Sequence, residues 1–211
     1  MSSSQVLGRS PTAILSAAQV QVRDLLARYA TLGQEESREK SRLFCKIRQE
    51  LLILLEVEES LFYPTVQDLD VESSNQAVVK AQMDHRVVKA FLKSLTDLSS
   101  ENTSLDPMMD ALLQCVLRHF ELEQSRIFPP SRTLSQEALQ KMSVRMETLG
   151  GRLRMNQERE QQAERDRNRF YPTLQDKNGA PEDDRDTPLS LESPGDLNER
   201  HPSDFENWGS E

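Results

Sequence analysis

The sequence predicts an all-α protein: an antiparallel up-down-up-down four-helix bundle with a fifth helix and an acidic tail. No glycine occurs between Gly33 and Gly150, and prolines are sparse over the same stretch. Four segments between Ser10 and Pro130 carry apolar residues at alternating spacings of three and four, which is the period of an amphipathic helix. The connections between these segments are short, which favours antiparallel neighbours. Strand-like alternation and a glycine-rich phosphate loop are both absent, so nucleotide-dependent chemistry is not expected.

Capping residues and prolines set the expected ends of the first two helices. The first begins at Ser10-Pro11, because serine caps well and proline suits a first turn, and it ends near Gly33. The second runs from about Glu36 to the residue before Pro64, which cannot donate the next backbone hydrogen bond. The residues expected to face inward share the helical spacing: Leu15, Ala18 or Gln19, Val22, Leu26 and Tyr29 on the first helix, and Ile47, Leu51, Leu54, Glu58 and Leu61 on the second.

The third and fourth helices follow the same pattern. The third is expected from near Ser74 to about Leu98, and the fourth from Asp106-Pro107 to Pro129-Pro130, two prolines that end it. Their expected inward residues are Val78, Ala81, His85, Val88 and Leu92 on the third helix, and Leu112, Cys115, His119, Leu122 or Glu123, and Arg126 on the fourth.

A fifth helix is expected to start near Thr133 or Ser135, with an apolar stripe that stops at Asn156. Because the stripe is so short, we expect this helix to cover one flank of the bundle and not to form a dimer contact. Gly150-Gly151 is expected to loosen or kink the helix. The stripe consists of Leu139, Met142, Met146, Leu149 and Leu153. The predicted organisation is a flexible start at 1–10, the bundle with the start of the fifth helix at 11–150, a charged helical extension at 151–169 and a disordered tail at 170–211.

The negative charge of the chain is concentrated in its last forty-one residues. The formal net charge is −9, and residues 171–211 hold eleven acidic and three basic side chains together with five of the ten prolines. A segment of this composition cannot bury enough apolar surface to offset its ordering entropy, which predicts disorder. The rest of the chain is nearly neutral, so we expect no nucleic-acid binding and no binding to an anionic membrane.

Two further features predict a cytoplasmic protein. No apolar run is long enough to span a membrane, and residues 1–10 lack the apolar core of a leader. The two cysteines, Cys45 and Cys115, have no disulfide-framework spacing, so both are expected to be thiols. A segment of the tail, 170–176, repeats 62–68 with one change; it either docks on the body or is a duplication without a role.

Two segments of the body repeat each other with one informative difference. One copy reads His-x-x-x-Glu over 119–123 and the other reads Leu-x-x-x-Glu over 54–58, each ending six residues before a proline. Residues four apart share a helix face, so the first pair can bind one metal ion. A second, earlier echo aligns Gln19 with His85. The two halves of the bundle therefore look alike, with inward histidines only in the second half.

Four ionisable side chains are thus expected to face the core: Glu58, His85, His119 and Glu123. A charge in a bundle core is costly unless it is paired or bound to a metal, and bundle cores commonly hold metals. These four are the candidate metal ligands. The alternative is a metal-free polar cluster that pairs each histidine with a glutamate through hydrogen bonds. Cys115, one turn before His119, is a further possible ligand, although a packing role is favoured.

The motifs Glu-Glu-x-x-Phe-Tyr-Pro, from Glu58, and His-x-x-x-Glu-x-x-x-x-Phe-Pro, from His119, resemble the hemerythrin-like, or HHE cation-binding, domain. The resemblance covers about residues 11–150. In that family a four-helix bundle holds two non-haem irons through histidines from all four helices and two bridging carboxylates. It implies that His85 and His119 are the histidines of the third and fourth helices, and that Glu58 and Glu123 are the bridging carboxylates.

Two positions depart from the pattern of the family. Gln19 stands where the histidine of the first helix belongs, and Leu54 stands where that of the second belongs. In the family these two histidines serve the same iron, so the resemblance implies one intact and one depleted half-site. The expected site holds one ion, either iron, manganese or zinc, or no ion at all. Gln19 is expected to bond to Glu58 or a water, and reversible dioxygen binding by two irons is expected to be absent.

These observations lead to two main functional hypotheses. The first is a hemerythrin-like metal-binding protein with a reduced, single-metal iron site, acting in iron handling or in oxygen or redox sensing rather than as an enzyme. The second is a metal-free bundle that serves as a protein-interaction module, with the acidic tail as an arm for a basic partner. An oxidative enzyme with mononuclear iron ranks below both, since a fold alone does not imply chemistry.

Overall fold

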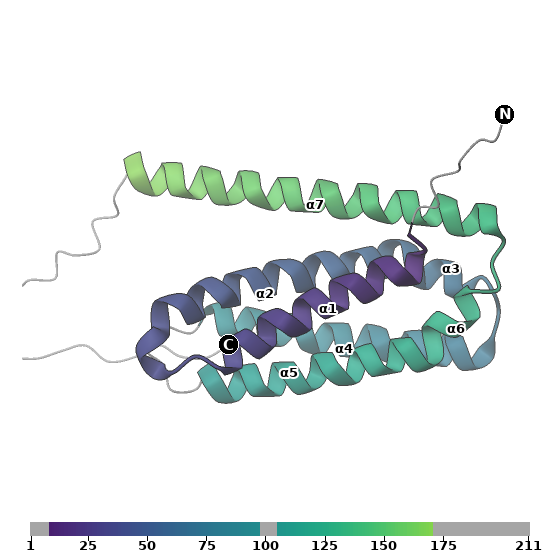
Figure 1. Cartoon of the computed structure of the whole chain (residues 1–211), viewed down its shortest axis with the longest axis horizontal. Helices are drawn as coiled ribbons and strands as arrows, with labels where there is room; N and C mark the ends of the chain where they lie inside the picture. Colours follow the sequence, from purple (N-terminus) through teal and green to yellow (C-terminus); the bar gives the residue numbers. More distant parts are fainter. Residues whose placement is uncertain (1–8, 98–104, 171–211) are drawn as a thin grey trace, which may run out of the picture. The chain divides into compact units, whose positions relative to one another are not determined.

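The computed structural model describes residues 9–97 and 105–170, which are almost entirely helical and contain no strand. The predicted all-α bundle is confirmed, and Figure 1 shows the helices labelled α1, α2, α4 and α5 side by side, with α7 along them. The long helices are α1 (Pro11–Ala30), α2 (Ser37–Val57), α4 (Glu72–Asp97), α5 (Leu105–Leu122) and α7 (Gln136–Phe170). The short ones are the 3₁₀ turn η1 (Gln34–Glu36), the π-helical turns η2 (Glu58–Phe62) and η3 (Glu123–Ile127), and the α-helical turns α3 (Tyr63–Gln67) and α6 (Phe128–Ser131).

The predicted cap at the start of α1 is confirmed. The Ser10 hydroxyl accepts a hydrogen bond from the Ala13 amide at 3.3 Å, which satisfies one of the free donors of the first turn. The helix ends at Ala30, slightly before Gly33, and η1 leads directly into α2. This short connection makes α1 and α2 neighbours, and α4 packs on α5 in the same way.

The prolines predicted to end the second and fourth helices instead lie inside helical segments, so that prediction was wrong. Helical structure continues past Pro64 to Gln67 and past Pro129 to Ser131. The reason is the π-helical turn before each proline, in which the amide of Tyr63 bonds back to the carbonyl of residue 58, five positions earlier. The amide of residue 128 bonds to residue 123 likewise. A wider turn relieves the clash that proline makes in a regular α-helix.

The same two turns shift the buried face of each helix by one residue. Leu61 is only half-buried and Arg126 is exposed, whereas Phe62 and Ile127 are completely buried. The inward stripes predicted from α-helical spacing therefore fail at their last positions. Both π-helical turns begin at a predicted ligand, residue 58 in η2 and residue 123 in η3. Such turns are frequent at functional sites.

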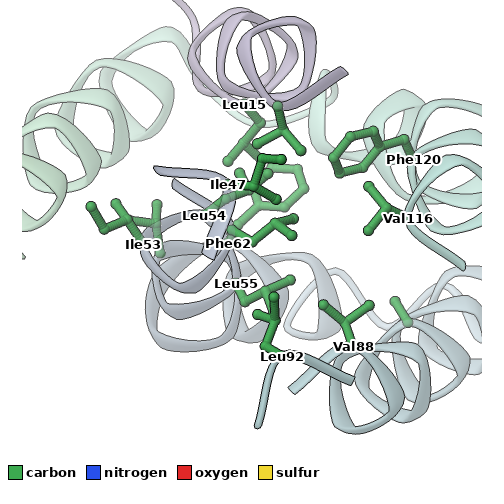
Figure 2. Packing of buried hydrophobic residues seen from close by; sticks show 14 of the residues in the cluster. Leu15, Ile47, Ile53, Leu54, Leu55, Phe62, Val88, Leu92, Val116 and Phe120 are labelled. Carbon is green, nitrogen blue, oxygen red and sulfur yellow. The ribbon is translucent and has the colours of Figure 1, made fainter. Parts of the chain in front are cut away.

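The core is one continuous cluster to which all four bundle helices contribute. Figure 2 shows Leu15 of α1, Leu54 of α2, Val88 of α4 and Phe120 of α5 converging on it. The α7 helix packs against α1 and α2, as expected of a helix that covers one flank, and it contributes two buried methionines, Met142 and Met146.

The α7 helix begins after Ser135, whose hydroxyl accepts a hydrogen bond from the Ala138 amide. It continues through Gly150 and Gly151 without interruption. A Cβ at Gly150 would lie 3.6 Å from Nη1 of Arg154 and 4.0 Å from a Val57 methyl group, so the space there would accept a small side chain in ordinary van der Waals contact.

Residues 1–8, 98–104 and 171–211 lie outside the described part of the chain. The predicted flexible start therefore falls outside the described residues, except for residues 9 and 10. The predicted disordered tail and the repeat over 170–176 also fall outside them, except for residue 170. Among the helices that are described, none has the length and apolar character needed to cross a membrane.

Candidate metal centre

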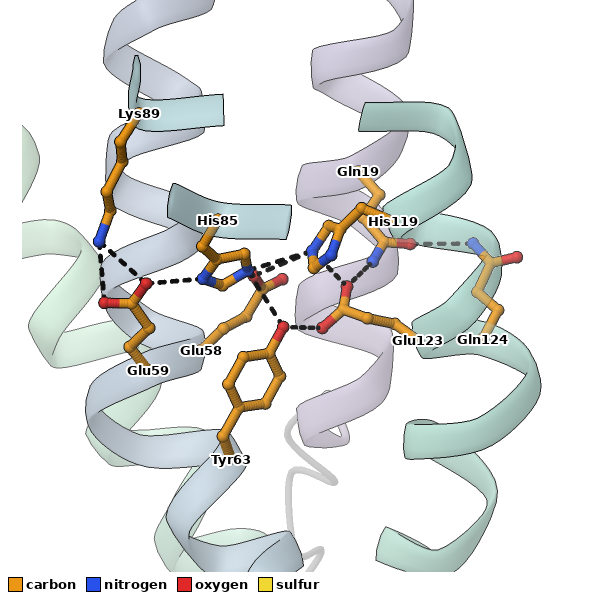
Figure 3. A network of polar contacts seen from close by, with 9 residues as sticks. All are labelled: Gln19, Glu58, Glu59, Tyr63, His85, Lys89, His119, Glu123 and Gln124. Atoms are coloured by element: carbon orange, nitrogen blue, oxygen red, sulfur yellow. Dashed lines mark hydrogen bonds and ion pairs between the residues drawn. The ribbon is translucent and has the colours of Figure 1, made fainter. Parts of the chain in front are cut away.

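All four predicted ligands are buried at one level of the bundle, where Figure 3 shows them converging. Glu58 begins η2, His85 lies in the middle of α4, His119 is near the end of α5, and Glu123 begins η3. The exposed fraction is 0% for Glu58, His85 and Glu123 and 1% for His119. Three continuous helical stretches, α2–η2, α4 and α5–η3, thus bring two imidazoles and two carboxyl groups to a buried site.

Three of the four residues form a compact set of donor atoms. Nε2 of His85 lies 3.2 Å from Oε2 of Glu58, and Nε2 of His119 lies 3.7 Å from the same oxygen. The two imidazole nitrogens are 3.2 Å apart. Ligands that share one ion at about 2.1 Å have separations of this size. Glu58, His85 and His119 therefore form a group that could hold a metal ion.

The hydrogen bonding of Glu58 supports this interpretation. Neither of its carboxylate oxygens has a hydrogen-bond partner, although both are completely buried. The two imidazole nitrogens are near enough to be ion-pair partners, but they do not satisfy these oxygens with hydrogen bonds of good geometry. An unsatisfied buried carboxylate is costly, and a cation between Glu58, His85 and His119 would remove the cost. The donor set therefore fits a divalent metal.

The two buried glutamates have opposite electrostatic properties. Burial by itself raises the pKa of Glu58, but the facing imidazoles of His119 and His85 outweigh it and hold the pKa below its usual value. Burial, followed by the charge of Glu58, raises the pKa of Glu123 well above its usual value. Two carboxylates this close cannot both ionise easily. Without a metal, a proton is therefore held more readily by Glu123 than by Glu58.

Glu123 stands beside the compact set and already has two partners of its own. Its Oε1 accepts a hydrogen bond from the Tyr63 hydroxyl at 2.9 Å, and its Oε2 accepts one from the Gln19 amide at 2.7 Å. Oε2 is also 3.4 Å from Nε2 of His119. The structure therefore brings Glu123 to the site, while its role as a ligand stays a prediction.

Gln19 and Leu54, the two positions without histidine, are both buried. The Gln19 side chain donates its hydrogen bond to Glu123 and not to Glu58, the glutamate expected from the sequence. The reason is that η3 places Glu123 next to α1. The Gln19 carbonyl also accepts a hydrogen bond from the exposed Gln124 at 2.9 Å. Leu54 packs within the apolar core.

Three contributors to the site were missed by sequence reasoning. The Tyr63 hydroxyl lies 3.1 Å from Nε2 of His85, and it is completely buried because the π-helical turn places it on the inner face. Burial, and then the charges of the nearby glutamates, raises the pKa of Tyr63 well above its usual value. Glu59 and Lys89 form a chain to the other nitrogen of His85. In the sequence, the only sign of this chain of contacts was a second glutamate, Glu59, directly after Glu58.

Cys115 does not join the site. It is a free thiol, half-buried on α5, and Val116 takes the inward position instead. Cys45 is also free, and it is exposed. The packing role favoured for Cys115 is consistent with its contact with the core cluster.

A four-helix bundle with histidines and carboxylates projecting into its centre defines a class of helical metal-binding proteins. Comparison with known families identifies the family within this class. The chain matches the Hemerythrin HHE cation binding domain over residues 10–131, which is more than half of its length, and it therefore belongs to that family. The resemblance found in the two motifs is thereby confirmed.

A solved structure gives the same fold. The chain is similar to a hemerythrin HHE cation binding domain-containing protein from Mycobacterium kansasii, with 21% sequence identity and a TM-score of 0.57. The match covers 68% of this chain and 88% of that chain. At this identity the likeness shows the fold alone. No curated protein matches the chain.

Proposed function

We propose that this protein binds a single iron ion at the centre of the bundle and acts in iron handling or in sensing oxygen or redox state. The observation that carries the proposal is the carboxylate of Glu58, which is buried without a hydrogen-bond partner and faces the Nε2 atoms of His85 and His119. These three residues would hold the metal, with Glu123 as a further ligand once it exchanges one of its present partners.

The composition of the donor set favours iron among the divalent metals. Two histidines and one carboxylate on one face of an ion, with other positions open, are typical of non-haem Fe(II). When bound, the iron would supply reversible one-electron chemistry and affinity for dioxygen. The protein contributes a set of buried side chains that excludes bulk water, together with the polar groups of Tyr63 and Gln19.

A single ion is favoured because the neighbouring half of the site offers no nitrogen ligand. Leu54 has no donor atom, and the Gln19 amide is bonded on both sides, to Glu123 and to Gln124. Glu123 in turn has each of its oxygens engaged. A second metal would have to displace these hydrogen bonds and would gain no imidazole in return.

Thermal unfolding of the metal-free protein with added Fe(II), Mn(II) or Zn(II) tests the proposal. A ligand that binds only the folded state raises the melting temperature. At a ligand concentration of 100 times the dissociation constant, it adds about 2.7 kcal/mol to the free energy of unfolding. We expect the shift to be absent in His85→Ala. If no divalent ion changes the melting temperature of the wild-type protein, the proposal is wrong.

The second candidate function is a metal-free interaction module. It is favoured by the network of Tyr63, Glu123, Gln19 and Gln124, which closes through hydrogen bonds without any ion. It predicts that stability does not respond to divalent ions and that His85→Ala costs no more than a loss of packing. The melting experiment therefore separates the two candidates.

A further inference from the structure

The two histidines of the compact set differ in how their second ring nitrogen is held. Nδ1 of His85 lies 2.7 Å from Oε1 of Glu59, whereas Nδ1 of His119 is buried without a hydrogen-bond partner. Figure 3 shows Glu59 on the side of His85 that faces away from Glu58. Of these two imidazoles, only His85 is fixed from both ends.

Glu59 is itself held in place by Lys89. The Lys89 ammonium lies 2.9 Å from each oxygen of the Glu59 carboxylate, and Lys89 follows His85 by one turn of α4. Glu59 is therefore a carboxylate and can only accept hydrogen bonds.

A carboxylate at Nδ1 determines which imidazole nitrogen carries the proton. Because Glu59 can only accept, the proton of neutral His85 must be on Nδ1, and the lone pair must be on Nε2. Nε2 is the atom that faces Glu58 and His119. A histidine that binds a metal usually donates its other N–H to a carboxylate or carbonyl in this way, which orients the ring and raises its basicity.

We propose that Glu59, held by Lys89, is a positioning residue that fixes His85 as the Nδ1–H tautomer and directs its Nε2 lone pair into the metal centre. This inference rests on the proposed function for its metal-binding consequence, but the tautomer is a property of the metal-free protein. The geometry also distinguishes the two histidines: the Nδ1 atom of His85 has a carboxylate partner, whereas the Nδ1 atom of His119 has none.

The test uses Glu59→Met, which removes the acceptor but keeps the length of the side chain. The matched control is Glu56→Met, because Glu56 is exposed, belongs to the adjoining turn of α2 and bonds only to Ser60. Nitrogen-15 NMR of the imidazole rings in metal-free protein, at about pH 8.5 where an ordinary imidazole is neutral, reports the protonated nitrogen. Competition with a chelator reports the metal dissociation constant.

The expected result is an Nδ1–H tautomer for His85 in the wild type and in Glu56→Met, lost in Glu59→Met. Iron affinity should fall about 10-fold to 100-fold in Glu59→Met, the usual cost of removing such a partner. Glu59→Gln keeps an acceptor oxygen and should retain the Nδ1–H tautomer of His85. Lys89→Met should lose part of the iron affinity. Lys93→Met, which changes an exposed lysine on the next turn of α4, should keep the wild-type affinity.

Two outcomes would overturn the inference: an Nε2–H tautomer in the wild type, or a Glu59→Met protein with the tautomer and affinity of Glu56→Met. A wild-type protein that binds no metal would count against the proposed function alone. The NMR comparison would still decide whether Glu59 fixes His85.

Discussion

The two halves of the buried polar layer have the same fold but different chemistry. In one half, His85 and His119 face Glu58, and no hydrogen bond satisfies the carboxylate. In the other half, Gln19 and Tyr63 each donate a hydrogen bond to Glu123, His119 is the imidazole beside it, and Leu54 is apolar. Under the proposed function, Gln19 and Leu54 close one metal position, while the helices that carry the other position keep their packing.

The largest expected effect is on the histidine half. Replacing His119 by alanine removes one of three converging ligands and leaves Glu58 buried with a single imidazole, so we expect metal affinity to fall by more than about 100-fold, beyond the usual cost of losing a supporting partner. Equilibrium competition with a chelator measures it. His201→Ala, which changes the third histidine of the chain, is the control and should bind as the wild type does. Equal affinities for both variants would contradict the assignment of His119.

The second prediction restores the depleted half. Placing histidines at both positions, Gln19→His with Leu54→His, returns the ligand pattern that the family resemblance implies, and it also frees Glu123 from the Gln19 amide. We expect the bound metal to rise from one to two ions per chain, as measured by elemental analysis. Each single variant serves as a control and should stay at one ion. A double variant that folds and still binds one ion would show that more than these two residues closes the second position.

The third prediction concerns packing at Leu54. This side chain is almost completely buried and also lines a hollow of about 310 Å³ between α1, α2 and α7. Truncation to alanine removes apolar contacts and enlarges the hollow, which should cost about 2–5 kcal/mol of unfolding free energy. Urea unfolding measures the loss. Leu52→Ala, at a half-buried position on the same helix, should cost less, and equal costs would mean that Leu54 is not a core residue of this layer.

The smallest expected effect is at Gln19. Alanine there removes the donor to Oε2 of Glu123 and leaves this buried oxygen without its partner, which should cost about 1–3 kcal/mol. Gln21→Ala, exposed on the same helix, should be nearly neutral in urea unfolding. If both variants were equally stable, the Gln19 amide would not be the group that holds Glu123.

Much of this site could be predicted from the sequence because helical spacing alone places Glu58, His85, His119 and Glu123 on inner faces. The spacing failed at Cys115, where Val116 is the buried residue, and at the two places where the helix stopped being α-helical. Each π-helical turn adds a residue to the turn, and α-helical periodicity cannot reveal it. Leu61 was therefore expected inside and Phe62 was not.

The partners of the ligands were also out of reach of sequence reasoning. Tyr63 enters the site through the π-helical turn that follows Glu58, and Glu59 meets His85 across two helices. Gln19 was expected to bond to Glu58, but the approach of η3 to α1 gives it Glu123 instead. Contacts between helices depend on packing, which one sequence does not specify.

The count of metal ions per chain tests the central claim most directly. Protein purified without oxygen and reconstituted with excess Fe(II) should retain one iron per chain after desalting, and exposure to air should give no absorption from an oxo-bridged pair. Two irons per chain with that absorption would contradict the account, because it would mean that Gln19 and Leu54 do not close the second position.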